Sequence, residues 1–185
     1  MRTFIAIEIP KIVKEIIEQF ENQLKSEKAK ITWVKPDNVH ITLKFLGEVE
    51  ESKIPEIHNT LKICVSKQKP FDIEVAGSGV FPNFTRPRVL WVGLKKGTEE
   101  LKNIAQSIDN ELEKFGFKKE ERDFKPHLTI GRVKFIHNPQ EFLQKMNSEE
   151  FKGEMFIARE ILIMKSDLKP TGAVYTKLHI IEFVV

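Results

Sequence analysis

Two short segments of this chain place a histidine and a threonine two residues apart. They are Val39-His40-Ile41-Thr42-Leu43 and Pro126-His127-Leu128-Thr129-Ile130. Successive side chains of an extended strand point to opposite faces, so in each segment the imidazole and the hydroxyl share one face while the apolar side chains share the other. We therefore expect two strands that each bury an apolar face and present a histidine and a threonine together.

Two imidazoles and two hydroxyls have the properties needed for displacement at phosphorus. Histidine gives or takes a proton near neutral pH, so a neutral ring can remove a proton from an attacking water while a protonated ring donates to the leaving oxygen on the opposite side. The hydroxyls of Thr42 and Thr129 can hydrogen-bond the non-bridging phosphate oxygens. Each imidazole can contribute on the order of 10²–10⁴ in rate. A strained cyclic diester would need no metal ion for this reaction.

The other three histidines lack this arrangement. His58-Asn59-Thr60 has the same spacing, but we expect it in a helix over 54–68, where positions two apart point about 200° apart around the axis. His137 is expected in a loop, and His179 in a strand with no hydroxyl two residues later. We interpret all three as structural or surface residues.

The two histidine segments fit three alternative roles less well. Two strands could simply turn polar faces toward solvent, although lysine, glutamate or serine would serve equally well. A metal site would need a third ligand, and no carboxylate shares either strand face nearby. A serine hydrolase would need a nucleophile elbow, which the sequence lacks. We expect neither a metal ion nor a cofactor.

Periodicity and turn residues predict the elements that position these side chains. Helices are expected at 11–28, 54–68, 98–115 and 139–146, with Thr98 as a helix cap, and strands at 3–9, 31–34, 39–46, 71–80, 88–94, 127–134, 151–158, 161–164 and 175–185. Each half of the chain contains a helix followed soon by a histidine-bearing strand. We therefore expect two related lobes with sheets that meet at a cleft. No linker separates them, which predicts one domain over residues 1–185.

The composition is that of an ordinary globular protein. The chain has 185 residues, 41% hydrophobic and 31% charged, and its net charge of +3 is too small for a general nucleic-acid coat. One cysteine and no long apolar run predict a cytoplasmic protein without a membrane segment. The charged residues are mainly 24 Lys and 22 Glu, against 6 Arg and 5 Asp. This bias is typical of proteins from hot environments, or simply of well-solvated helix faces.

The two histidine segments, with their flanking residues, resemble the paired signature motifs of a known superfamily. The segments are Trp33-Val34-Lys35-Pro36-Asp37-Asn38-Val39-His40-Ile41-Thr42-Leu43-Lys44-Phe45-Leu46-Gly47 and Phe124-Lys125-Pro126-His127-Leu128-Thr129-Ile130-Gly131-Arg132. They resemble the 2H phosphoesterases and, more narrowly, the RNA 2′,3′-cyclic phosphodiesterases, also called 2′-5′ RNA ligases. The segments Arg2-Thr3-Phe4-Ile5-Ala6 and Val89-Leu90-Trp91-Val92-Gly93 agree with this branch, so the resemblance spans the whole chain.

The resemblance implies a fold, a reaction and the roles of four residues. The fold would be α+β and bilobal, with two pseudo-symmetric lobes of antiparallel-rich sheet flanking a central cleft and helices outside. The reaction would be hydrolysis of an RNA 2′,3′-cyclic phosphate to a 2′-phosphomonoester, with His40 as proton donor and His127 as proton acceptor. Thr42 and Thr129 would bind the phosphate. The residues themselves do not assign the acid and the base, because the two motifs are nearly equivalent.

The partners implied are RNA with a cyclic phosphate end, such as tRNA fragments, or a cyclic nucleotide. The same chemistry could join a 5′-hydroxyl to a cyclic phosphate and form a 2′-5′ linkage. We expect a monomer that works without a metal ion or a cofactor. Two alternatives stay open at this point: a non-catalytic nucleotide- or RNA-binding module, and a phosphodiesterase for a small cyclic phosphate such as cyclised ADP-ribose.

Four further side chains are candidates for substrate contacts. Lys44 has the strand parity of His40, whereas Arg132 has the opposite parity to His127 and would reach the site only if the strand bulged at Gly131. The loop 81–88 contains Phe84 and Arg88, a combination suited to single-stranded RNA. The alternative for this loop is an ordinary hairpin connection with a hydrophobic anchor.

Overall fold

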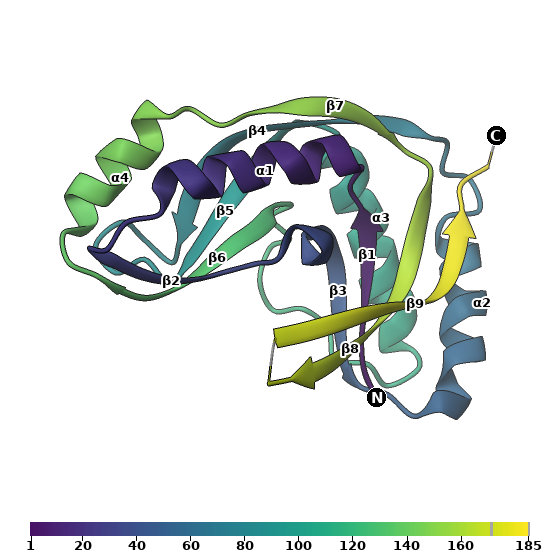
Figure 1. Ribbon diagram of the computed structural model, residues 1–185. Helices are drawn as coiled ribbons and strands as arrows, with labels where there is room; N and C mark the ends of the chain where they lie inside the picture. Colours follow the sequence, from purple (N-terminus) through teal and green to yellow (C-terminus); the bar gives the residue numbers. More distant parts are fainter. Residues whose placement is uncertain (171, 185) are drawn as a thin grey trace.

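The computed structural model describes residues 1–170 and 172–184, and Figure 1 shows its helices and strands in sequence order. The helices are α1 (Lys11–Leu24), α2 (Ile54–Cys64), α3 (Thr98–Glu113) and α4 (Pro139–Ser148), with single 3₁₀ turns η1 (Pro36–Asn38) and η2 (Glu51–Lys53). The strands are β1 (Arg2–Glu8), β2 (Ala29–Trp33), β3 (His40–Glu48), β4 (Phe71–Phe81), β5 (Val89–Lys96), β6 (Leu128–Ile136), β7 (Lys152–Ala158), β8 (Glu160–Lys169) and β9 (Gly172–Glu182). Among the helices of these residues, none has the length and apolar character to cross a membrane.

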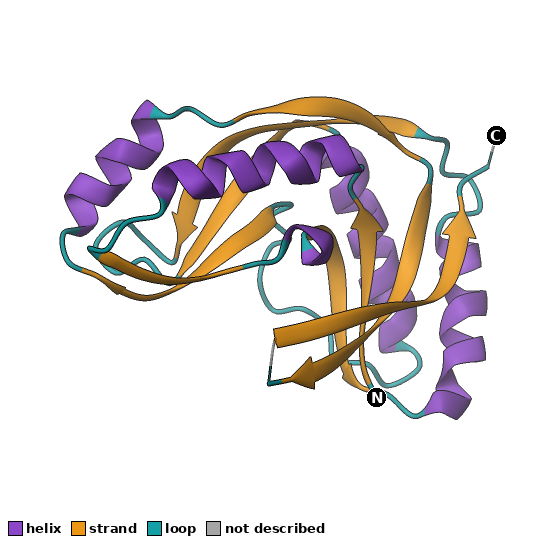
Figure 2. Ribbon diagram, viewed as in Figure 1, coloured by secondary structure: helices purple, strands orange, loops and turns teal. Residues whose placement is uncertain are grey.

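The strands form one strongly curled sheet, and Figure 2 shows its strands in orange with the helices in purple. Its order is β7-β4-β5-β6-β3-β1-β8-β9, with β2 paired to β6, and the pairs are antiparallel. We call β3, β1, β8 and β9 the β3 lobe, and β2 and β4–β7 the β6 lobe. The prediction of an α+β fold with two lobes of antiparallel sheet is confirmed, and the two sheets prove to be one.

The two halves of the sequence interleave in this sheet. Strand β4 and the start of β5 come from the first half of the chain but belong to the lobe of β6, and the hairpin β8-β9 comes from the second half but joins the lobe of β3 through β1. The helices also contact elements from the other half of the sequence. Helix α1 of the first half contacts β7 and α4 of the second half, and α3 of the second half contacts β3 and α2 of the first half. One cluster of buried hydrophobic side chains therefore includes strands and helices of both lobes.

Helical periodicity explains how α1 packs. Val13, Ile17, Phe20 and Leu24 recur at intervals of three or four residues and are buried, which places them on one stripe of the helix. Phe20 also makes an edge-to-face contact with Phe151, whose ring centroid lies 5.2 Å away. The apolar stripe thus fixes α1 against the β6 lobe.

Several predicted boundaries were wrong by a few residues. Helix α1 ends at Leu24, and residues 25–28 that follow it are exposed. Helix α2 ends at Cys64, although Val65 directly after it is still buried. Thr98 is the first residue of α3 rather than its cap, and the cap is Gly97 with a φ of 87°. A Cβ at Gly97 would lie 2.7 Å from the Asp72 carbonyl oxygen, so glycine is required there. The predicted last strand extends to Val185, which lies outside the described residues.

Candidate active site

The two histidine segments meet where the lobes join. Strands β3 and β6 share a single residue pair, Ile41 with Leu128, and both of these side chains are fully buried in the core. His40 and Thr42 flank Ile41, and His127 and Thr129 flank Leu128. These four side chains are half-buried, on the sheet face opposite Ile41 and Leu128. We call this the site face.

The pairing register sets the relative position of the two histidines. With Ile41 opposite Leu128 in antiparallel strands, His40 lies across from Thr129, and Thr42 lies across from His127. The two histidines then occupy diagonal positions, whose Cα atoms in antiparallel sheets are separated by about 7–8 Å. Such a gap can hold a phosphorus atom between two imidazole rings. The four residues are also related by an approximate two-fold axis through the central pair.

Both imidazole rings are held through the same nitrogen. Nδ1 of His40 lies 2.6 Å from the carbonyl oxygen of Asn38, and Nδ1 of His127 lies 2.6 Å from that of Lys125. A carbonyl oxygen only accepts hydrogen bonds, so Nδ1 carries the proton in each ring. Nε2 of each ring is thereby left to accept or donate a proton, and either histidine can act as acid or base.

Burial affects both histidines in the same direction. Burial lowers the pKa of His40, assisted by the charge of Lys14 and opposed by the Asn38 carbonyl. Burial also lowers the pKa of His127, opposed by the Lys125 carbonyl. Both rings are therefore neutral at pH 7 before substrate binds, because the charged form loses solvation in these positions. An anionic phosphate between them would raise the pKa of the adjacent rings.

Aromatic rings surround His40. The Phe4 ring stacks on the imidazole with a centroid distance of 4.7 Å and an interplanar angle of 27°. Tyr175 contacts the imidazole edge-on at 5.3 Å and contacts Phe4 at 4.9 Å. Phe4 and Tyr175 come from β1 and β9, far from the motif in sequence. The sequence analysis placed them in predicted strands but did not identify them as neighbours of His40. Together they fix the ring plane and keep solvent from its faces.

A second aromatic group supports His127. The Phe81 ring meets this imidazole edge-on at 5.0 Å, and Phe81 in turn packs against Trp91 at 5.3 Å. Trp91 pairs with Thr129 on the neighbouring strand. Its ring covers Gly79, where a Cβ would lie only 2.2 Å from the indole. Glycine at this position therefore allows the indole to lie flat against the backbone of β4.

A β-bulge follows each motif threonine. Register shifts occur between the pairs Ala6–Thr42 and Ile5–Lys44, and between the pairs Trp91–Thr129 and Leu90–Gly131. The extra residues are Leu43 in β3 and Ile130 in β6. A bulge reverses the alternation of the side chains that follow it. The two bulges occupy equivalent places in the two motifs, in keeping with the approximate symmetry.

The bulges change the predicted positions of two cationic side chains. Lys44 turns to the core side of β3, where it is 3% exposed and pairs with Asp109 at 2.5 Å, so its predicted place beside His40 was wrong. Arg132 turns to the site face, as the prediction required, although the bulge is at Ile130 and not at Gly131. The charge of Arg132 acts on Tyr175: burial raises the pKa of this phenol, and Arg132 and Arg2 oppose the rise. Arg132 thus lies near the aromatic group around His40.

The remaining sequence candidates, Phe84 and Arg88, belong to the loop between β4 and β5. Phe84 is 61% exposed in a loop ordered by the Asn83 side chain, whose Oδ1 accepts hydrogen bonds from Thr85 and the Arg86 N–H. The Arg88 side chain is exposed, while its backbone N–H donates to the Phe81 carbonyl at 2.7 Å. Substrate contacts of Phe84 and Arg88 therefore stay predictions.

His58, which sequence analysis excluded from the site, lies in a helix as predicted. His58 is on α2 and contacts His179 on β9, with ring centroids 4.8 Å apart. Within residues 1–170 and 172–184 we find no group of three or more histidine, cysteine or acidic side chains that could hold a metal ion.

Comparison with known proteins identifies relatives over nearly the whole chain. The LigT like Phosphoesterase family model matches twice, at residues 7–91 and 92–175. An RNA 2′,3′-cyclic phosphodiesterase of Methanocaldococcus jannaschii is 43% identical over 178 residues, covering 95% of this chain and 96% of the relative. The protein of the same name from Archaeoglobus fulgidus is 39% identical over 184 residues, covering 98% of this chain and 100% of the relative.

Solved structures share the fold at lower identity. The protein TT0787 of Thermus thermophilus superposes with a TM-score of 0.83 at 24% identity, covering 99% of this chain and 98% of that one. E. coli LigT complexed with NADP⁺ superposes with a TM-score of 0.77 at 21% identity, covering 100% of this chain and 98% of that one. Each of the two family matches contains one histidine–threonine motif.

Proposed function

The chain belongs to the LigT-like phosphoesterase family, and we propose that it hydrolyses the 2′,3′-cyclic phosphate ends of RNA to 2′-phosphomonoesters. The names of its archaeal relatives support this substrate. The observation that best supports the proposed mechanism is the pair of histidines related by the approximate two-fold axis at Ile41 and Leu128. Each has its Nδ1 bound to a carbonyl oxygen and its Nε2 available for proton transfer.

The proposed reaction is an in-line displacement at the cyclic phosphorus. Nε2 of His127 takes a proton from water as the water oxygen bonds to phosphorus. The bond from phosphorus to the 3′ oxygen breaks, and the protonated His40 gives its Nε2 proton to that oxygen. The product keeps its phosphate on the 2′ oxygen. His127 then holds a proton and His40 lacks one, and exchange with solvent restores the starting state.

Three side chains would stabilise the charge on the phosphate. The hydroxyls of Thr42 and Thr129 donate hydrogen bonds to the non-bridging oxygens from either side, and Arg132 supplies a positive charge on the same face. Fixed donors of this kind do not have to reorganise as charge develops, so they lower the barrier more than solvent can. The substrate anion also raises the pKa of the nearby His40, which favours the protonated acid.

The same site would support 2′-5′ ligation. If the 5′-hydroxyl of a second RNA takes the place of water, its oxygen bonds to phosphorus while the 3′ oxygen leaves. The product is a 2′-5′ phosphodiester with a free 3′-hydroxyl. Water is far more concentrated than RNA ends, so we expect hydrolysis to dominate unless the second strand is held in place.

Product analysis tests the proposal. The protein is incubated with a nucleoside 2′,3′-cyclic phosphate and with RNA ending in a cyclic phosphate, with and without chelator, and the product isomer is identified by ³¹P NMR. We expect a 2′-phosphate, undiminished turnover with chelator, and loss of turnover in His40→Ala and His127→Ala. His58→Ala is the matched control, since that ring lies on α2.

The outcomes separate the alternatives. Full activity in either catalytic variant would refute the two-histidine mechanism. Tight binding of the ligand without any turnover would instead indicate a non-catalytic binding module. Turnover of a cyclised ADP-ribose derivative with no turnover of RNA ends would keep the chemistry and replace the substrate.

A further inference from the structure

A buried ion pair lies directly beneath the candidate active site. The Lys44 side chain is 1% exposed and that of Asp109 is 14% exposed, and Lys44 Nζ lies 2.5 Å from Asp109 Oδ1. Lys44 follows the bulge two residues after Thr42 on β3, and Asp109 is on α3. Burying two charges costs solvation, so a pair in this position must make further contacts to persist.

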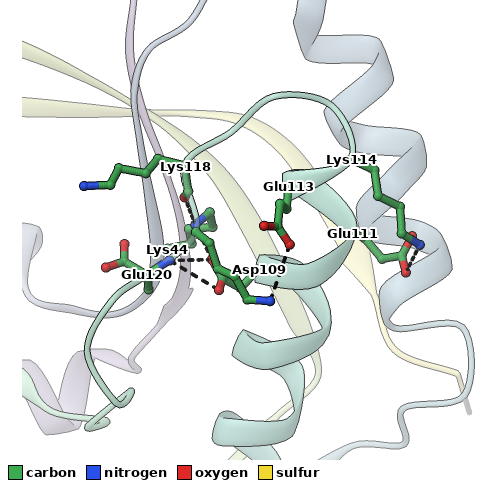
Figure 3. A network of polar contacts seen from close by, with 8 residues as sticks. Lys44, Asp109, Glu111, Glu113, Lys114, Lys118 and Glu120 are labelled. Atoms are coloured by element: carbon green, nitrogen blue, oxygen red, sulfur yellow. Dashed lines mark hydrogen bonds and ion pairs between the residues drawn. The ribbon is translucent and has the colours of Figure 1, made fainter.

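The further contacts are with the segment that leads to His127. Lys44 Nζ also donates to the Lys118 carbonyl oxygen at 2.8 Å, and the Glu120 backbone N–H donates to the Asp109 carboxylate at 3.1 and 3.3 Å. Figure 3 shows Lys44 reaching both the Asp109 carboxylate and the backbone at Lys118, with Glu120 on the same carboxylate. The ion pair thus joins β3, α3 and residues 118–120.

Residues 117–127 contain no helix or strand, yet they must place His127 precisely. Among the described residues, the backbone of 118–126 forms hydrogen bonds with two groups outside residues 118–127. These groups are the side chains of Lys44 and Asp109. The Lys125 carbonyl that fixes the His127 ring belongs to this same segment. These hydrogen bonds tie the segment before His127 to the strand that carries His40, in addition to the packing of Phe124 against the core.

We propose that Lys44 and Asp109 are positioning residues that set the place of His127 relative to His40. This inference rests on the proposed function for its kinetic test. A misplacement of about 1 Å in such a site costs on the order of 10²-fold in rate. The pair touches no reacting atom, so its loss lowers kcat while KM changes little.

The test uses Lys44→Met and the double variant Lys44→Met/Asp109→Leu. The single variant leaves an unpaired buried carboxylate and is expected to be less stable. The double variant removes both charges, which restores stability but not the hydrogen bonds to residues 118 and 120. We expect both variants to lose ten- to a hundredfold in kcat for a 2′,3′-cyclic nucleotide, with KM within threefold of the wild type. Lys114→Met is the control, because Lys114 pairs with Glu111 at 2.6 Å on the exposed end of the same helix.

A second measurement does not need activity. In ¹H–¹³C NMR spectra, the Cε1–H signal of His127 is expected to shift in both variants, while that of His40 stays in place. Recovery of kcat to within twofold of wild type in the double variant, or an unmoved His127 signal, would refute the proposal. An equal loss of kcat in Lys114→Met would also refute it. If the wild type turns over no cyclic phosphate, the proposed function fails, and the His127 signal still decides the positioning role.

Discussion

Replacing Glu21 with glutamine should stabilise this protein, and more strongly as the pH rises. Glu21 lies on the buried side of α1 and is 3% exposed, and its Oε1 has no hydrogen-bond partner among the described residues. Burial raises the pKa of Glu21 from its ordinary 4.5 to about 8; the charge of Lys25 opposes the rise, and that of Glu18 adds to it. The carboxyl group therefore stays protonated in the folded protein at neutral pH, whereas it ionises in the unfolded chain.

The sign and size of the effect follow from this difference. Below pH 4.5 the group is protonated in both states and has no pH-dependent effect on stability. Between pH 4.5 and 8 the unfolded state alone ionises, so the folded state loses stability as the pH rises. Since each pH unit between these values corresponds to about 1.4 kcal/mol, the full loss is about 4–5 kcal/mol. Glutamine cannot ionise, and we expect Glu21→Gln to gain about 3–4 kcal/mol more at pH 8.5 than at pH 5.

Urea denaturation of wild type and Glu21→Gln at pH 5 and pH 8.5 measures this quantity. The shift in the midpoint of thermal unfolding should be roughly 10 °C larger at the higher pH. Glu15→Gln is the matched control, because Glu15 is an exposed residue of the same helix and is not among the charges that act on Glu21. The dependence of its stability on pH should stay that of the wild type. A gain in Glu21→Gln that is equal at both pH values would refute the reasoning.

Three further predictions concern the site. Because burial lowers the pKa of both His40 and His127, kcat/KM for a cyclic nucleotide should peak below pH 6.5 and fall towards pH 8; a rise over that interval in a pH–rate profile would contradict it. Gly79→Ala should displace the Trp91 indole, since the new Cβ would lie 2.2 Å from it; near-ultraviolet circular dichroism should report the change, and Ser78→Ala should not produce it. Arg132→Ala should lower kcat on the order of 10²–10³-fold. It should also raise the pKa of Tyr175, the single tyrosine of the chain, in an ultraviolet titration; an unmoved pKa would place the guanidinium elsewhere.

Much of the fold could be predicted because the signals are local. The apolar run of β1, the alternation at the start of β3 and the stripe of α1 depend on near neighbours in sequence, and their elements were found within a few residues. The motif pairs His40–Thr42 and His127–Thr129 also needed only strand geometry. The prediction that His58 and Thr60 lie in a helix is confirmed, and their exclusion from the site stays a prediction.

The features missed depend on contacts between distant residues. Strict alternation placed Lys44 beside His40, but the bulge at Leu43 reverses the strand, and such a bulge has no clear local signature in Val39–Phe45. Phe4 and Tyr175 come together around His40 only because β1 pairs with both β3 and β8. Asp109 meets Lys44 across 65 residues of sequence. None of these pairings can be deduced from spacing alone.

The interleaving of the two halves bears on how such a chain could arise. The family model matches once in each half, yet β4 and the start of β5, in the first match, complete the lobe of β6, and β8 and the start of β9, in the second match, complete the lobe of β3. A half-length protein would leave the lobe of its motif strand without these strands unless a second copy supplied them. A two-fold dimer that exchanged these strands would place one His-x-Thr strand from each subunit across the axis. Gene duplication and fusion of such a dimer would give the present topology.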